Sequence, residues 1–176
     1  LRSKILSQEL VTYIVLGSHS RLARLKKFKV ENDEECIFLS FNNYASLVQT
    51  LDNVIADSSG SIIVLLPPSS IPKKKNRISL KKMAMINYPV WGWFDLPNSE
   101  DKVSSNLKKL NTFIRTTPSI EQGIYFTKNL YFSIGGMGKF KADYFTEISK
   151  RLYSRLDPQK PLAPLTSRSS SKVSLL

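Results

Sequence analysis

The residue types best suited to nucleophilic catalysis or to zinc binding are scarce in this chain. It contains a single cysteine, Cys36, and a single histidine, His19. Zinc sites need three or four ligands, and a nucleophilic serine or cysteine needs a partner base. Cys36 lies in an apolar run, which is typical of a small buried residue. The sequence therefore argues against zinc enzymes and Ser–His or Cys–His hydrolases, and it excludes an internal disulfide.

The densest charge lies between Pro72 and Lys82, where six of eleven residues are basic. The segment has two interpretations: a solvated charged surface, or a clamp in which Lys73, Lys75 and Arg77 bind a substrate diphosphate. The chain as a whole has a formal net charge of +12. This charge predicts an acidic partner, which is nucleic acid, an anionic membrane surface or a larger protein complex.

Apolar periodicity predicts a βαβαβ unit in the first part of the chain. Strands are expected over residues 10–16, 36–41 and 61–66, with helices over 20–28 and 44–56 between them. This order predicts parallel strands joined by helical crossovers.

The same reasoning continues to the end of the chain. Helices are expected over 78–86, 102–116 and 144–156, strands over 88–96 and 122–127, and a helical turn over 129–134. We expect one domain over residues 1–166 and a disordered Ser/Lys-rich tail over 167–176.

No apolar run reaches the ~18 residues of a membrane span, and the first ten residues do not read as a secretory signal. We therefore expect an intracellular protein, soluble or peripheral, in the cytoplasm or an organelle interior.

The second half of the chain resembles a known family. The segments Glu121–Ile124 and Gly135–Met137 resemble a block of small family 2 glycosyltransferases, the type associated with radical-SAM or selenoprotein clusters. Glu147–Leu152 and Thr166–Arg168 are similar to later segments of that family. The resemblance covers roughly residues 60 to 168.

This resemblance implies a single α/β domain of the GT-A type, with three layers and a mixed, mainly parallel sheet. It implies an active site at the carboxyl ends of the strands and a nucleotide sugar as substrate. It also implies Glu121 and Asp143 as candidate catalytic acids, and Gln122 and Asp95 as candidate substrate-binding residues.

Two acidic motifs of the family are replaced in this chain. Pro67, Pro68 and Ser69 stand where an Asp-x-Asp-like motif would bind a divalent metal on the diphosphate. Tyr144 and Phe145 stand where a Glu-Asp pair would supply the base, with Asp143 one residue earlier. We therefore expect no metal site and no cofactor, and a divalent metal is implied only for an active transferase.

Three functions follow as hypotheses. The first is a non-catalytic glycosyltransferase-like protein that keeps the fold as a binding or structural element. The second is an active, metal-independent transferase in which basic residues neutralise the diphosphate. The third is a basic structural subunit of a nucleic-acid or membrane-associated complex. Base stacking on Trp91 or Trp93 is a further possibility for nucleic acid, although alternation along the strand favours core packing.

Overall fold

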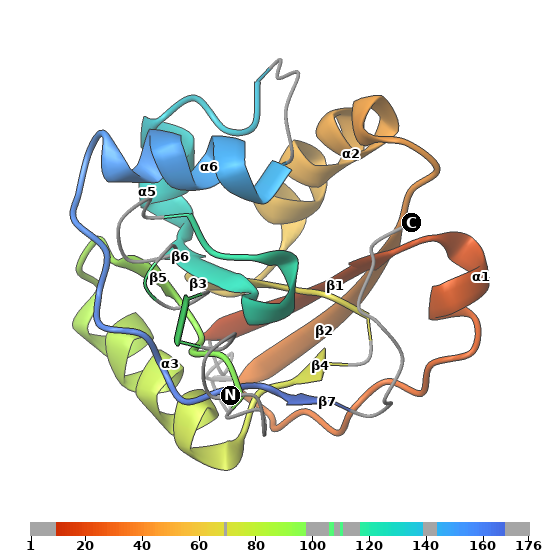
Figure 1. The fold of residues 1–176 in the computed structure, drawn as a ribbon, viewed down its shortest axis with the longest axis horizontal. Coiled ribbons are helices and arrows are strands. Elements are labelled where there is room, and N and C mark those ends of the chain that lie inside the picture. The colour runs from red at the N-terminus through yellow and green to blue at the C-terminus, as the bar shows by residue number, and fades with distance from the viewer. Residues whose placement is uncertain are drawn as a thin grey trace, which may run out of the picture.

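The computed structural model describes residues 10–68, 70–97, 106–107, 110, 117–138 and 144–167. Five strands form the main sheet: β1 (Val11–Gly17), β2 (Glu34–Ser40), β3 (Ile62–Leu66), β5 (Trp91–Trp93) and β6 (Ile124–Thr127). Their order across the sheet is β2-β1-β3-β6-β5 (Figure 1). β1 pairs in parallel with β2 and β3, whereas β6 runs antiparallel to both β3 and β5. The prediction of an α/β domain with a mixed sheet is confirmed.

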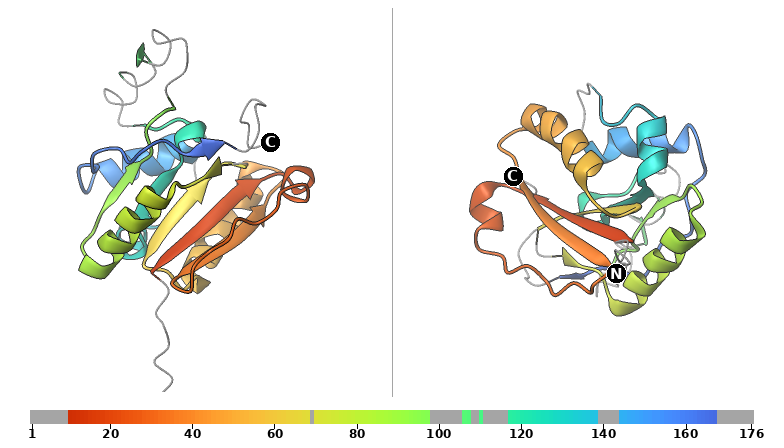
Figure 2. Two further views of the ribbon diagram at one scale, coloured as in Figure 1. Left: turned by 90° about the horizontal axis from the view of Figure 1, so that it is seen from below. Right: turned by 180° about the vertical axis from the view of Figure 1, so that it is seen from behind.

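Helices cover both faces of this sheet (Figures 1 and 2). They are α1 (His19–Leu22), α2 (Tyr44–Asp57), α3 (Lys74–Ile86), α5 (Lys128–Ser133) and α6 (Tyr144–Tyr153), with a 3-10 turn, η1 (Ile120–Gln122). Buried side chains of α2, α5 and α6 share one core cluster, and those of α1 and α3 share the other. The sheet is therefore the middle layer of three.

The central strand β1 shows why the sheet is covered twice. Successive side chains of a strand point to opposite faces. Ile14 and Leu16 belong to the core under α2 and α6, while Tyr13 and Val15 belong to the core under α3. All four are buried, which explains why β1 reads as a continuous apolar run rather than an alternating one.

The helix α2 forms where the sequence predicts it. Asn43 caps its start by accepting a hydrogen bond from the backbone N–H of Ser46 at 2.9 Å. Leu47, Leu51 and Ile55 recur every four residues and are fully buried against the sheet.

The last described segment, residues 157–167, forms a C-terminal strap. The backbone N–H groups of Gln159 and Leu162 donate to the carbonyls of Trp91 and Trp93, at 2.8 and 3.0 Å. The strap ends in β7 (Thr166–Ser167), which pairs antiparallel with β4 (Ser70–Ile71). It thus joins the outer edge of β5 to the segment after β3 (Figure 1).

Several element boundaries differ from the sequence predictions. The helix expected over 20–28 is only the four residues of α1, and α3 begins at Lys74 rather than 78. The strand expected over 88–96 shortens to β5, because Asn87 ends α3 in a left-handed conformation (φ 53°) and residues 88 and 89 are exposed. The strand expected over 122–127 begins two residues later, as β6, because Gln122 is the last residue of η1. Ser167, the first residue of the expected tail, is paired in β7.

The helix expected over 102–116 lies outside the described residues apart from 106–107 and 110. Within the part of the chain that the structure describes, no helix combines the length and apolar character needed to cross a membrane.

Candidate functional site

The parallel strands end at one edge of the sheet, which we call the carboxyl edge. β1 ends at Gly17 beside Ser40 of β2, and β3 ends at Leu66. The antiparallel β6 begins at this same edge, because Ile124 pairs with both Leu65 and Trp93. Open α/β sheets bind their ligands at such an edge, which makes the carboxyl edge the candidate site.

The turn after β3 closes part of the carboxyl edge. Pro68 is buried and packs against Gly17, so that a Cβ added to Gly17 would lie 2.8 Å from Pro68 Cγ and 3.3 Å from Leu22 Cδ2. A proline ring offers neither a carboxylate nor a backbone N–H. The position that the family resemblance assigns to metal binding is therefore taken by an apolar turn packed onto the end of β1.

Glu121 and Gln122 lie at the carboxyl edge in η1, directly before β6. The Gln122 side chain is buried, and its Oε1 accepts a hydrogen bond from the backbone N–H of Ser119 at 2.9 Å. Gly123 then turns the chain with φ 63°, and a Cβ there would lie 3.0 Å from the carbonyl oxygen of Leu65. Gln122 thus supports the turn into β6, while the Glu121 side chain is exposed to solvent.

Asp95 is brought to the same edge by β5. The backbone N–H of Phe94 donates to the carbonyl of Gln122 at 3.3 Å, which connects the two segments. The Asp95 carboxylate accepts a hydrogen bond from the N–H of Leu96 at 2.8 Å. Of the predicted acids, Glu121 and Asp95 therefore share the carboxyl edge. Asp143 lies outside the described residues.

The predicted basic residues separate into two groups. Lys73 and Lys75 flank the start of α3 and are exposed. Arg77 lies against the sheet, where its Nε donates to Glu34 Oε1 at 2.9 Å. Glu34 is the first residue of β2, so this contact lies at the opposite, amino edge. The structure therefore does not bring Arg77 to the same edge as Glu121.

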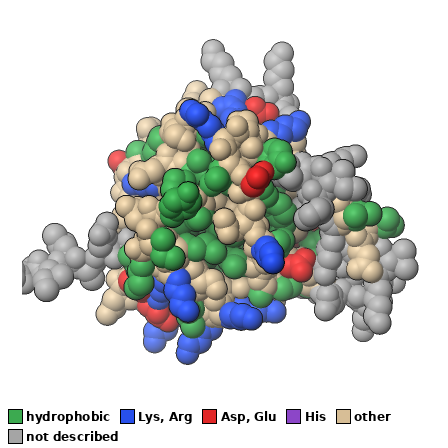
Figure 3. All heavy atoms as spheres, turned by 90° about the vertical axis from the view of Figure 1, so that its left-hand side faces the viewer, with side chains coloured by type: hydrophobic (Ala, Val, Ile, Leu, Met, Phe, Trp, Pro, Cys, Tyr) green, Lys and Arg blue, Asp and Glu red, His purple; other side chains and the backbone are tan. Residues whose placement is uncertain are grey.

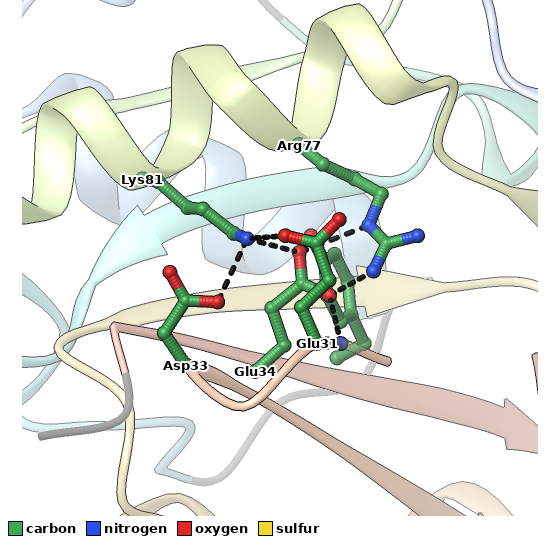
Figure 4. A network of polar contacts seen from close by, with 6 residues as sticks. Glu31, Asp33, Glu34, Arg77 and Lys81 are labelled. Carbon is green, nitrogen blue, oxygen red and sulfur yellow. Dashed lines mark hydrogen bonds and ion pairs between the residues drawn. The ribbon is translucent and has the colours of Figure 1, made fainter. Parts of the chain in front are cut away.

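Arg77 belongs to an amino-edge ion cluster with Glu31, Asp33, Glu34 and Lys81 (Figure 4). The Glu34 side chain has no solvent exposure, and the ammonium of Lys81 lies 2.7 Å from an Asp33 carboxylate oxygen. Lys81 also pairs with Glu31, and the second Arg77 nitrogen, Nη2, pairs with Glu34 Oε2.

The charges in this cluster stabilise one another. Burial alone would raise the pKa of Glu34. The net effect is nevertheless a lowered pKa, because Glu34 accepts hydrogen bonds from Arg77 and from the Glu31 N–H and lies near the positive charges of Arg77 and Lys81. The hydrogen bond to Glu34 raises the pKa of Arg77. The pKa of Tyr13, whose hydroxyl donates to Glu34 at 3.2 Å, is raised mainly by burial. Each charged group of the cluster has an opposite charge beside it, and we interpret the cluster as a structural connection between β2 and α3.

A second polar contact, which is partly buried, was not foreseen from the sequence. Asp52 on α2 accepts hydrogen bonds from the Tyr131 hydroxyl and from the Met137 N–H, the latter at 3.1 Å. Burial and then the hydrogen bond to Asp52 raise the pKa of Tyr131. Asp52 thus anchors the Gly135–Met137 turn, one of the segments that carry the family resemblance. The only sequence signal was an acid at position 52, close to the apolar face of a predicted helix.

Among the described residues, no three His, Cys, Asp or Glu side chains group closely enough to hold a metal ion. Glu121 and Asp95 are the predicted acids that the described residues place at the carboxyl edge.

Comparison of the chain with protein-family models, with curated proteins and with solved structures finds no match.

Proposed function

We propose that this protein is a family 2 glycosyltransferase-like domain that keeps its fold as a binding or structural element and does not carry out metal-dependent sugar transfer. The observation that carries the proposal is the packing of Pro68 against Gly17 at the carboxyl edge. An apolar turn occupies the place where the resemblance implies the metal-binding acids.

The fold supports the first half of this proposal. The mixed sheet, with four strands in one direction and β6 antiparallel to them, agrees with the architecture that the resemblance implies. Glu121 and Gln122, which carry the most specific part of the resemblance, lie at the edge where such a domain would bind its substrate. A GT-A-type assignment is thus the interpretation we adopt.

The chemistry of sugar transfer supports the second half. Departure of a nucleoside diphosphate develops negative charge, which a divalent cation held by carboxylates normally offsets. Pro67 and Pro68 have no carboxylate with which to hold such a cation. Glu121 lies at the same edge, just before β6, whereas the Pro68 turn packs on β1, the other neighbour of β3.

An active, metal-independent transferase is the alternative. Lys73 and Lys75 are exposed at the start of α3 and are available to an anion. Arg77 is bound to Glu34 and is excluded from such a clamp. This alternative needs Glu121 or Asp143 as the base.

The test is calorimetric titration with UDP- and GDP-sugars, with and without Mn²⁺, together with an assay for released nucleotide. We expect no nucleotide release and no binding that Mn²⁺ strengthens. The matched variants are Glu121→Gln at the carboxyl edge and Asp57→Asn at the exposed end of α2. The proposal would be overturned in favour of an enzyme if the protein released nucleotide, if Glu121→Gln lowered this release at least about tenfold, and if Asp57→Asn left it unchanged.

A further inference from the structure

The outer side of α3 carries lysines and apolar side chains in a single stripe. Lys75, Ile78, Lys82 and Met85 follow one another at intervals of three and four residues, which places them on one side of a helix. All four are exposed, and Met85 is 70% accessible to solvent. An apolar residue so exposed on an ordered helix contributes nothing to the core of the domain.

The opposite side of α3 is already used by the fold. Leu80 and Ala84 pack against the sheet, and the buried Asn76 amide donates to the carbonyl of Ala163 in the C-terminal strap at 2.7 Å. Arg77 and Lys81 are held by the amino-edge ion cluster. The orientation of α3 is therefore fixed, and its outer stripe is held facing solvent.

Apolar exposure continues where the helix ends. Ile86 is 73% and Tyr88 is 66% exposed, on either side of Asn87. α3 ends on the left-hand side of Figure 1, the side that faces the viewer in Figure 3. Figure 3 shows hydrophobic side chains gathered on this side, with Lys and Arg side chains mainly along their lower margin and a few Asp and Glu side chains among them. Such clustering differs from the scattered single apolar residues of an ordinary surface.

The charge that α3 itself contributes to this surface has one sign. The helix α3 contains no Asp or Glu, and Lys73 and Lys74 add two more exposed lysines at its start. Glu31 and Asp33, on the segment that leads into β2, are both paired with Lys81. A partner of this surface must therefore be anionic and must also accept apolar side chains.

We propose that this surface, the α3 face, binds the surface of an anionic lipid bilayer. It is formed by Lys74, Lys75, Ile78, Lys82, Met85, Ile86 and Tyr88. Lysines bind anionic headgroups while apolar side chains enter the boundary between headgroups and acyl chains. Nucleic acid would satisfy the lysines but would give Met85 and Ile86 no apolar environment, so the bilayer accounts for both features.

This inference is independent of the proposed function, because it concerns the outer side of α3 and not the carboxyl edge. The experiment is co-sedimentation of the protein with vesicles of phosphatidylcholine, with and without phosphatidylglycerol. We expect binding only to the vesicles that contain phosphatidylglycerol, and weakening of that binding by salt.

Three variants separate the α3 face from net charge. Lys74→Gln/Lys75→Gln/Lys82→Gln should weaken binding about a hundredfold, since each lysine near an anionic surface contributes about a factor of five. Met85→Ser/Ile86→Ser should weaken it roughly tenfold at unchanged charge. The control Arg24→Gln/Lys150→Gln/Arg155→Gln removes three charges from exposed sites on other segments. It should weaken binding by less than about tenfold.

Circular dichroism shows whether each variant is folded. If Met85→Ser/Ile86→Ser is not folded, Tyr88→Ser is tested in its place. Three results would overturn the proposal: no binding to either vesicle, equal losses in the two triple variants, or no effect of the apolar substitutions. The last result, with DNA binding that the lysine variant abolishes, would indicate a nucleic-acid surface instead.

Discussion

Pro68 lies directly against Gly17, so that a Cβ on residue 17 would come within 2.8 Å of Pro68 Cγ. Gly17 does not have a positive φ, so its requirement for glycine comes from packing and not from backbone conformation. The contact joins the end of β1 to the turn after β3 and closes the carboxyl edge between them.

The first prediction tests this contact. Gly17→Ala should lower the free energy of unfolding by about 1–3 kcal/mol, because the added methyl group overpacks a buried contact. Urea denaturation measures the change. In a double-mutant cycle, Pro68→Ala should remove most of the penalty of Gly17→Ala. Additive effects of the two substitutions would mean that the two residues do not touch in solution.

The second prediction concerns the amino-edge ion cluster. Arg77→Met should lower the free energy of unfolding by about 3–5 kcal/mol, because it leaves the fully buried Glu34 carboxylate without its main partner. Glu147→Gln is the matched control, since its partner Arg151 lies 3.0 Å away in a partly exposed pair on α6. That substitution should cost about 0.3–0.5 kcal/mol. Equal losses in the two variants would contradict a buried cluster.

The third prediction is the pH dependence that the same cluster produces. The pKa of Glu34 is lower in the folded protein than in the unfolded chain. The stability that depends on its ionised form is therefore complete above the ordinary pKa range of a glutamate and is lost as the pH falls through the lowered value. Thermal unfolding from neutral to acidic pH should show a falling Tm, and Glu34→Gln should reduce that slope. If Glu147→Gln reduced the change of Tm with pH as much as Glu34→Gln does, Glu34 would not be the source of the pH dependence.

The fourth prediction compares the two glycines of the turn that Asp52 anchors. Gly135 and Gly136 both have positive φ, at 84° and 65°, so alanine at either position should cost about 1–2 kcal/mol. A Cβ at Gly136 would also lie 2.9 Å from Asp52 Oδ1, whereas nothing lies within 4 Å at Gly135. Gly136→Ala should therefore be more destabilising than Gly135→Ala by roughly 1 kcal/mol.

The double variant Gly136→Ala/Asp52→Ala separates the clash from backbone strain. In the Asp52→Ala background, Gly135→Ala and Gly136→Ala should lower the free energy of unfolding by the same amount, each measured against Asp52→Ala alone. A difference that persists in the Asp52→Ala background would mean that the clash is not its cause.

The sequence by itself determined the local elements of the first part of the chain. The apolar runs of β1, β2 and β3 and the four-residue spacing in α2 are local periodicities, which neighbouring residues alone produce. The absence of acids at positions 67 and 68 is likewise a property of the sequence and needs no coordinates.

Only the tertiary structure decided where distant side chains meet. Arg77 reads as part of a solvated basic run, yet it pairs with Glu34, 43 positions away, and Asp52 binds Tyr131 across 79 positions. The strands β4 and β7 are two residues each, too short for any period to be visible. The position of β6, antiparallel between β3 and β5, could not be predicted from the sequence either. Strand pairing depends on hydrogen bonds between segments far apart in the chain.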